Sequence, residues 1–243
     1  MTKFVLVHGA FHGSWCWDKV VPLLEAQGHD VIAVDLPGNT YGEFDIPLDQ
    51  VSLDSYAQYI CKVLDKLDES VVLVGHSLGG LTITQAAEYR PDKIRSLVYL
   101  TALLFENAVA QRPVVARDSE SIRAGLLRDD WTVSDDLASV TFLEGPPKCR
   151  FYNDCTDDDF TWAKAMLVPQ PSGPLIDPLQ TTAENFGRVQ KVYIECELDN
   201  ALSISYQREM QAKIPCDRTI TMRTGHSPFL SAPIELAEHL LSI

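Results

Sequence analysis

A short glycine-rich sequence constrains this chain more than any other feature. The sequence GHSLGG at 75–80 follows the apolar run 71–74 and precedes a helical pattern over 81–89. A G-x-S-x-G pattern between a strand and a helix is typical of a tight turn with a serine at its tip, because the glycines let two backbone segments pass closely. We therefore predict that Ser77 is a nucleophile; a glycine-rich turn with a solvated serine is the weaker alternative.

Apolar runs and helical patterns alternate along most of the chain. Apolar runs of strand length cover 4–7, 30–34, 71–74, 94–100, 189–196 and 219–222. Apolar residues at helical spacing cover 15–27, 53–67, 81–89, 203–213 and 233–241. Strands that are almost entirely apolar and separated by helices belong to a parallel sheet with helices on both faces. We therefore predict an α/β fold in which ligands bind at the carboxyl ends of the strands.

The alternation stops between about residues 105 and 186, in a segment rich in proline and acidic residues. A loop of about eighty residues without secondary structure would be improbable in a compact domain. We predict a mostly helical cap at 105–186, inserted into an α/β core formed by 1–104 and 187–243. Its aromatic residues are expected to pack a small core or to line a substrate pocket. They include Phe105, Trp131, Phe142, Phe151, Tyr152, Phe160 and Trp162.

Charge and cysteine content limit the classes of partner and the location. The chain has 34 acidic and 20 basic residues, a formal net charge of −14, so we expect no nucleic-acid partner and no membrane partner. The first residues resemble neither a signal peptide nor a spanning helix. The six cysteines lack C-x-x-C spacing, which favours reduced thiols in the cytoplasm over a zinc site. A Cys149–Cys155 bridge is the one disulfide left open.

Two histidines late in the chain are candidates for the base that Ser77 needs. After a G-x-S-x-G turn of this kind, the acid and then the histidine follow in chain order. His239 lies within the helical pattern 233–241, where a solvated side chain is expected, whereas His226 lies in a loop just after the apolar run 219–222. That loop is expected at a carboxyl end of the sheet, so we predict that His226 takes the serine proton and returns it to the leaving alcohol.

The acid is expected where the preceding strand ends. The apolar run 189–196 leads into Glu197 and Asp199, and the chain turns toward the next helix at Asp199. We predict that Asp199 orients the imidazole of His226 and stabilises its protonated form. Glu197 is the alternative, because a small error in the end of the strand would exchange the two carboxylates.

Two backbone N–H groups are candidates for an oxyanion hole. Leu78 follows the nucleophile at the start of a helix, whose dipole favours negative charge. Ala10 lies in the glycine-rich loop 8–15 after the first strand and supplies the second donor. A glycine-rich loop there can also indicate dinucleotide binding, but G-x-G-x-x-G is absent and Asp35 belongs to a D-L-P-G turn. We expect no cofactor and no metal.

Several segments together resemble one family. The sequences FVLVHGA (4–10), HGSWCW (12–17), GH (28–29), GHSLGG (75–80) and FGRVQKVYI (186–194) are similar to those of the plant methylesterase and hydroxynitrile lyase group of α/β-hydrolases and its bacterial esterase relatives. The resemblance covers most of the chain and is weakest in the cap. It implies an α/β-hydrolase fold.

The resemblance also implies roles for individual residues. The family's triad is the elbow serine, an aspartate after the penultimate strand and a histidine after the last, which match Ser77, Asp199 and His226. It therefore supports Asp199 over Glu197. The family's oxyanion amide after the His-Gly pair corresponds to Ala10.

The family contains two chemistries, and two positions help to separate them. The lyases resemble one another in a threonine after the first-strand histidine, which contacts the cyanohydrin oxygen, and a lysine after the catalytic histidine, which stabilises cyanide. This chain has Gly9 and Ser227 at those positions. Ester hydrolysis is therefore the favoured reaction. A hydroxynitrile or other C–C lyase that uses the same triad is the alternative, and a ligand-binding relative without catalysis is a third candidate from a different class.

The substrate expected from this sequence is a small apolar or aromatic carboxyl ester. Some family members place a cap tryptophan against the substrate, and Trp131 is the candidate counterpart. We expect Gly9, Phe11, Trp131 and Ser227 at the substrate pocket. The protein is expected to act as a monomer or a homodimer on a small-molecule ester.

Overall fold

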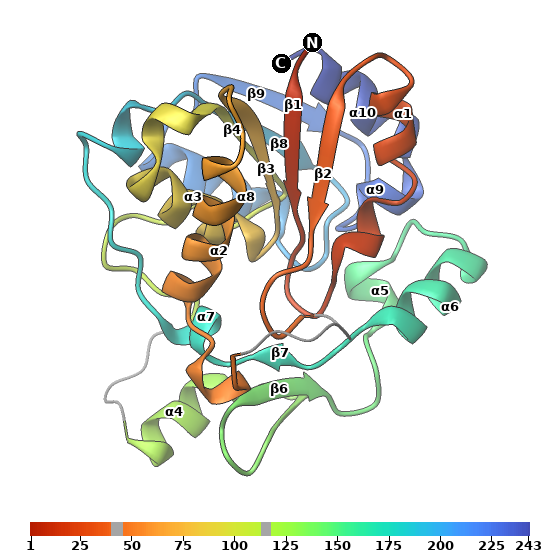
Figure 1. Ribbon diagram of the computed structural model, residues 1–243. Coiled ribbons are helices and arrows are strands. Elements are labelled where there is room, and N and C mark those ends of the chain that lie inside the picture. The colour runs from red at the N-terminus through yellow and green to blue at the C-terminus, as the bar shows by residue number, and fades with distance from the viewer. Residues whose placement is uncertain (40–45, 113–117) are drawn as a thin grey trace.

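A parallel sheet forms the centre of the molecule (Figure 1). The computed structural model describes residues 1–39, 46–112 and 118–243, so 113–117 of the expected cap lie outside the described residues. The six-stranded sheet has the order β2-β1-β3-β4-β8-β9, and every neighbouring pair is parallel. Its strands are β1 (Lys3–Val7), β2 (Asp30–Val34), β3 (Val71–His76), β4 (Ile94–Leu100), β8 (Lys191–Cys196) and β9 (Arg218–Met222). The predicted α/β fold is confirmed.

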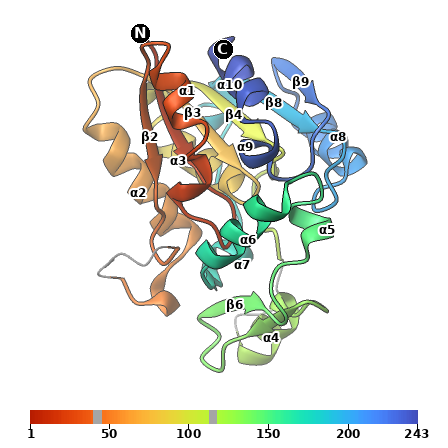
Figure 2. The same ribbon diagram turned by 90° about the vertical axis from the view of Figure 1, so that its right-hand side faces the viewer.

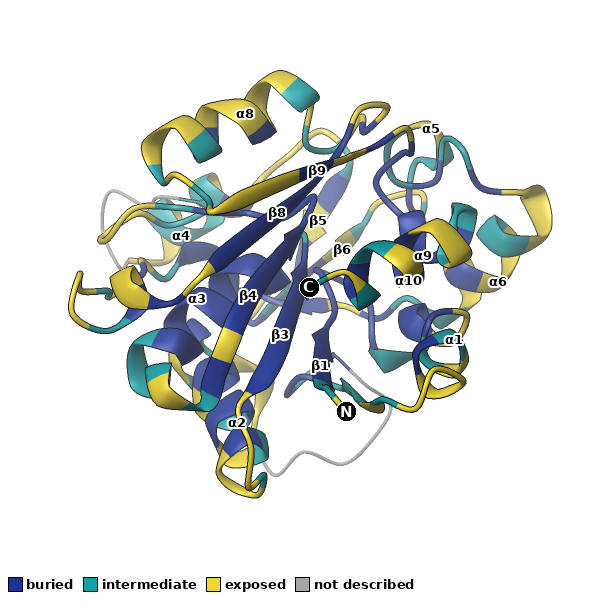
Figure 3. Ribbon diagram, turned by 90° about the horizontal axis from the view of Figure 1, so that it is seen from above, coloured by how far each residue is buried: buried dark blue, intermediate teal, exposed yellow. Residues whose placement is uncertain are grey.

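Helices cover both faces of the sheet. One face carries α2 (Leu53–Asp65), α3 (Gly79–Tyr89) and α8 (Ile204–Lys213), and the other carries α1 (Val21–Glu25), α9 (Pro228–Ser231) and α10 (Pro233–Leu241). The strands β3 and β8 are buried along their whole length (Figure 3), which explains the uninterrupted apolar runs 71–74 and 192–194 within them. In the described part of the chain, no helix combines the length and the hydropathy that crossing a membrane requires.

The segment 15–27 departs from the single helix that its spacing predicts. The structure divides it into a 3₁₀ helix at Ser14–Trp17 and the short α1, which begins at Val21. Pro22 explains the division, because proline has no backbone N–H and its ring would clash with the carbonyl four residues earlier in a continuous helix. A proline is tolerated in the first turn, and this is where Pro22 lies.

The cap lies across the carboxyl ends of the sheet strands (Figures 1 and 2). Its helices are α4 (Ser119–Leu126), α5 (Lys148–Phe151), α6 (Asp157–Met166) and α7 (Gly173–Ile176). It also contains an antiparallel sheet, which was not predicted, of β5 (Trp131–Val133), β6 (Ser139–Phe142) and β7 (Gln170–Pro171). These strands are too short for a period-2 pattern to stand out in the sequence.

The turn between β3 and α3 brings backbones unusually close together. A Cβ on Gly75 would lie 2.6 Å from the carbonyl oxygen of Gly79, and a Cβ on Gly80 would lie 2.2 Å from that of Leu103. Ser77, at the tip of this turn, has a φ of 51°. The glycines are therefore required by space, and the serine is held in a conformation that L-residues rarely adopt.

We expect Gly80→Ala to destabilise the protein even though alanine is the better helix former. The gain in helix propensity is about 1 kcal/mol, whereas forcing a methyl group against a backbone oxygen costs about 2–3 kcal/mol or more. The melting temperature should therefore fall by several degrees. Gly187→Ala is the matched control, because its Cβ would meet no atom closer than 3.4 Å. Equal melting temperatures for the two variants would contradict the close approach.

Three histidines are buried where the sheet meets the cap. His8 Nδ1 donates to a backbone carbonyl 2.8 Å away, and its Nε2 accepts from the N–H of Leu36 at 3.1 Å. His12 likewise donates from Nδ1 to a carbonyl at 2.7 Å and accepts at Nε2 from the Tyr152 hydroxyl at 2.9 Å. Burial lowers the pKa of His8 to about 4 and that of His12 to about 3, and it holds the pKa of His76 well below its ordinary value. All three are therefore neutral in the folded protein at neutral pH.

We expect mild acid to destabilise the protein through these histidines. An unfolded histidine binds a proton below about pH 6.5, so the stability that the neutral histidines contribute is complete above that pH and is lost as the pH falls. For His8 and His12 the loss continues down to their folded pKa values, about 4 and about 3. Each of these histidines adds up to about 1.4 kcal/mol per pH unit to the dependence of the free energy of unfolding on pH. Denaturant titrations measure this pH dependence between about pH 6.5 and pH 5, where few carboxylates titrate. A constant free energy of unfolding over that range would contradict the expectation.

Candidate active site

Ser77 lies at the point where β3 gives way to α3. Its N–H faces the carbonyl of Leu100, at 3.4 Å, and its own carbonyl accepts from the N–H of Leu103 at 2.9 Å and that of Gly80 at 3.1 Å. The strained backbone is thus tied to the end of β4 as well as to its own helix. The serine remains partly exposed, so its hydroxyl is held rigidly and stays accessible.

The loops after β8 and β9 bring two further side chains to Ser77. His226 Nε2 lies 3.1 Å from Ser77 Oγ, and His226 Nδ1 lies 2.7 Å from Asp199 Oδ2. His226 and Asp199 are 2% and 4% exposed. The three residues predicted from the sequence therefore form one continuous chain of hydrogen bonds at the carboxyl ends of β3, β8 and β9.

The carboxylate of Asp199 is fixed by four donors. Its Oδ1 accepts from the N–H of Ala201 at 2.6 Å and that of Leu202 at 2.9 Å. Its Oδ2 accepts from the Thr101 hydroxyl and from His226. Because every direction of the carboxylate is occupied, it can hold the imidazole in only one orientation. The sequence offered no signal for Thr101, which approaches from the end of β4.

The two alternatives weighed from the sequence lie elsewhere. Glu197 is exposed, and its N–H continues the ladder with β9 by donating to Met222 at 3.0 Å. His239 lies on α10, with its Nε2 3.7 Å from Glu235 Oε1. Neither side chain contacts Ser77 or its partners.

His76 supports the histidine loop from behind. Its Nε2 lies 2.8 Å from the carbonyl oxygen of His226, and the two ring centroids are 4.7 Å apart. The contact anchors the loop that carries His226 to the end of β3. Sequence reasoning missed this role because the G-x-S-x-G pattern leaves the position before the serine undefined.

The two predicted oxyanion donors have free backbone N–H groups. Within the described residues, neither the N–H of Ala10 nor that of Leu78 donates to another protein atom. Leu78 is the N-cap of α3, where amides and helix dipole favour an anion. Ala10 lines the pocket described below, whereas Leu78 does not.

The cap holds the loop that contains Ala10. Phe11 has a φ of 66°; its N–H donates to Gln170 Oε1 at 3.1 Å, and its carbonyl accepts from the N–H of Val168 at 3.0 Å. Gln170 is itself fixed by buried hydrogen bonds to Asn39 and Tyr56. The strained loop therefore keeps its shape through contacts made by β7 and the residues before it, which no sequence pattern indicated.

A cavity beside Ser77 lies between the core and the cap. Its lining residues are Ala10, Phe11, His12, His76, Ser77, Ala201, Leu202 and His226 from the core, and Gln111, Arg128, Trp131, Phe142, Pro146, Arg150, Phe151, Tyr152 and Leu167 from the cap. Phe11 packs against Phe142 and Trp131, with ring centroids 4.3 and 5.3 Å apart. The pocket expected to be apolar therefore has an aromatic wall and also two arginines.

Two of the expected pocket residues do not line this cavity. A Cβ on Gly9 would lie 2.8 Å from Ser77 Cβ, so the glycine is packed beneath the serine. Ser227 is fully buried, and its hydroxyl donates to the Phe151 carbonyl at 2.8 Å. Phe11 and Trp131 do line the cavity. Position 227 thus joins the histidine loop to the cap instead of facing a substrate.

Metal-binding and disulfide chemistry have no evident place in the described residues. No group of three or more His, Cys, Asp or Glu side chains among them could hold a metal ion. All six cysteines are free, Cys149 and Cys155 included, so the bridge left open by the sequence is not formed.

The comparisons with known proteins agree with this architecture. The model of the alpha/beta hydrolase family matches residues 4–239. Methylesterase 2 of Arabidopsis thaliana is 36% identical over 99% of this chain and 95% of its own length, and methyl jasmonate esterase 1 of Vitis vinifera is 32% identical over the same shares. The crystal structure of a pyrethroid hydrolase from Sphingobium faniae JZ-2 superposes with a TM-score of 0.83, at 29% identity over 99% of this chain and 96% of that one.

The family match, the fold and the geometry of the site agree with one another. The family match spans nearly the whole chain, and the relatives named as esterases align over almost their full lengths. The chain therefore belongs to the alpha/beta hydrolase family, within its methylesterase-like group, and is a carboxylic ester hydrolase.

Proposed function

We propose that the protein hydrolyses small apolar or aromatic carboxyl esters through Ser77, His226 and Asp199 and a covalent acyl-enzyme. One observation carries the proposal: the hydrogen bonds of 3.1 Å from Ser77 Oγ to His226 and 2.7 Å from His226 to Asp199. This is the geometry in which a neutral imidazole activates a serine hydroxyl.

The first half of the reaction forms the acyl-enzyme. His226 Nε2 takes the hydroxyl proton as Ser77 Oγ attacks the ester carbonyl carbon, and Asp199 keeps Nδ1 protonated and stabilises the imidazolium. The oxyanion of the tetrahedral intermediate accepts hydrogen bonds from the N–H groups of Ala10 and Leu78. When the C–O bond breaks, His226 returns the proton to the departing alkoxide.

The second half releases the acid. Water attacks the acyl carbonyl while His226 again accepts the proton, and the same two amides hold the second oxyanion. Collapse of this intermediate regenerates the Ser77 hydroxyl and frees the carboxylic acid. No step requires a group outside the chain other than substrate and water.

The surroundings of Gly9 and Ser227 support hydrolysis over cyanohydrin cleavage. A side chain at position 9 would begin 2.8 Å from Ser77 Cβ and 2.9 Å from His76 Nδ1, so the threonine of the lyases has no room here. The Ser227 hydroxyl is occupied by the Phe151 carbonyl and offers no positive charge to a leaving cyanide.

The proposal also includes a substrate class, a compartment and an assembly. The relatives named as methylesterase and methyl jasmonate esterase favour the ester of a small alcohol as the substrate, and the aromatic wall of the cavity favours an apolar or aromatic acyl group. Six free thiols suit a reducing compartment such as the cytoplasm. We keep a monomer or a homodimer as the assembly.

We expect substitutions within the triad to abolish turnover without unfolding the protein. Ser77→Ala or His226→Ala should lower kcat by about 10⁴-fold or more, because each removes the same nucleophilic step, and Asp199→Asn should lower it by a similar factor. Steady-state kinetics on an aryl acetate and melting curves measure both effects.

Two nearby residues serve as matched controls for these variants. Glu197→Gln and His239→Ala change an exposed acid and a helical histidine that do not contact Ser77, so kcat should stay within about twofold of the wild type. If Glu197→Gln lost activity while a folded Asp199→Asn kept it, the assignment of the acid would be wrong.

We also expect esters to be cleaved faster than the matching amides and cyanohydrins. An alkoxide leaves a tetrahedral intermediate more readily than an amine, so kcat/KM for 4-nitrophenyl acetate should exceed that for 4-nitroacetanilide by at least about tenfold. Mandelonitrile should release cyanide more slowly than any active ester is hydrolysed. Faster cyanide release, lost in Ser77→Ala, would favour the lyase alternative.

A further inference from the structure

The cap wall of the cavity carries a cluster of arginines. Arg128 and Arg150 line the cavity together with Trp131. The guanidinium carbons of Arg112 and Arg128 each lie 5.3 Å from the centroid of the Trp131 ring. Three cationic side chains thus gather around one wall of a substrate pocket, and we call Arg112, Arg128 and Arg150 the arginine cluster.

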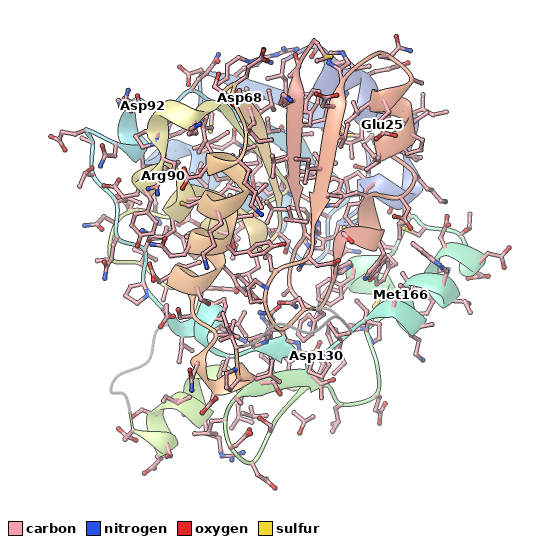
Figure 4. The ribbon with its side chains drawn as sticks, viewed as in Figure 1. Glu25, Asp68, Arg90, Asp92, Asp130 and Met166 are labelled. Atoms are coloured by element: carbon pink, nitrogen blue, oxygen red, sulfur yellow. The ribbon has the colours of Figure 1, made fainter. Side chains whose placement is uncertain are left out.

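Only one carboxylate among the described residues pairs with this cluster. Asp130 Oδ2 lies 2.5 Å from Arg150 Nη1, and Asp130 Oδ1 lies 4.0 Å from Arg128 Nε. Figure 4 labels Asp130 beside the cap strands. Within the part of the chain that the structure describes, three guanidinium groups and one paired carboxylate leave an excess of positive charge here, although the whole chain has a formal net charge of −14.

Hydrogen-bond donors around the cluster are also in excess. Trp131 is 7% exposed, and its Nε1 is buried without a hydrogen-bond partner, as are Nε and Nη2 of Arg112. Burial and the neighbouring Arg128 lower the pKa of Arg112, and Asp130 opposes them with a smaller effect. Buried donors without acceptors are costly, and of these two residues Trp131 lines the cavity whereas Arg112 does not.

Two members of the arginine cluster, Arg128 and Arg150, share a cavity with the serine. Ser77 and His226 line the same space as Arg128, Arg150 and Trp131, so a single ligand can contact both. A planar guanidinium matches the two oxygens of a carboxylate. Elsewhere the acidic surface of the protein disfavours anions, which makes this local excess of positive charge selective.

We propose that the arginine cluster binds a carboxylate carried by the substrate itself, so that the preferred esters are small molecules with a free carboxylate in addition to the ester group. The proposal rests on the proposed function and narrows it: the aromatic wall holds the apolar body of the ester, and the cluster holds its anionic end. Arg112, Arg128 and Arg150 would then determine specificity without taking part in bond cleavage.

Pairs of substrates that differ only in the carboxylate test the proposal. Monomethyl glutarate carries the carboxylate on the acyl portion and is compared with methyl pentanoate; 4-acetoxybutanoate carries it on the alcohol portion and is compared with butyl acetate. For at least one pair, kcat/KM should be higher for the anionic ester by about tenfold or more at low ionic strength. The preference should shrink in about 0.5 M salt. Equal or lower values for the anionic member of both pairs would overturn the proposal.

Substitutions within the cluster should remove the preference. Arg128→Gln, Arg150→Gln and Arg112→Gln should each reduce the ratio of the two kcat/KM values by about fivefold or more, chiefly through KM, and Arg128→Lys should restore part of it because the charge remains. Arg188→Gln is the matched control, since Arg188 pairs with Asp92 at 2.6 Å and does not line the cavity. A ratio that falls equally in Arg188→Gln would contradict a local role of the cluster.

A binding measurement separates this proposal from the proposed function. Calorimetry with Ser77→Ala should show monomethyl glutarate binding at least about tenfold more tightly than methyl pentanoate, and the added Arg128→Gln should abolish the difference. If the wild type hydrolyses neutral esters but neither kinetics nor binding favours the carboxylate, this inference fails and the proposed function stands. If no ester is hydrolysed while Ser77→Ala still binds the anionic ester through the cluster, the proposed function fails and the site stands.

Discussion

The close backbone contact at the turn between β3 and α3 is the constraint on which the rest of the site depends. Glycine at 75, 79 and 80 lets the strand, the helix and the end of β4 approach within distances that any Cβ would block. This approach holds Ser77 at a φ of 51° and ties its backbone to the ends of β3 and β4. Since β4, β8 and β9 follow in order across the sheet, the loops carrying Asp199 and His226 lie within reach of the same serine.

The cap covers the site and also holds two of its loops in position. Gln170 holds the loop containing Ala10 by accepting from the N–H of Phe11, and the Tyr152 hydroxyl holds the same loop by donating to His12 Nε2. The Phe151 carbonyl binds the Ser227 hydroxyl in the loop after β9. The cap is thus hydrogen-bonded to two of the loops that supply groups to the site, those after β1 and β9. A change in the cap therefore alters the orientation of reacting groups as well as the shape of the pocket.

Two opposite electrostatic environments lie side by side at the centre of the molecule. On the core side, the buried imidazoles of His8, His12 and His76 have lowered pKa values, are neutral and form hydrogen bonds to their surroundings. On the cap side, guanidinium groups exceed the carboxylates that face them. Neutral His76 holds the loop that carries His226 in place without adding charge beside it. The cationic cap wall provides a long-range attraction for an anion in a protein that otherwise repels anions.

The sequence by itself determined the order of elements and the parallel sheet, and it predicted Ser77 and His226 as site residues, because strand and helix periodicity and the glycine turn are local properties of the chain. It favoured Asp199 and kept Glu197 as the alternative, since the ladder between β8 and β9 decides which carboxylate turns inward. It could not reveal Gln170, Thr101, the short cap sheet or the arginine cluster. Those depend on contacts between residues far apart in the chain, and only the packing of the cap onto the core brings such residues together.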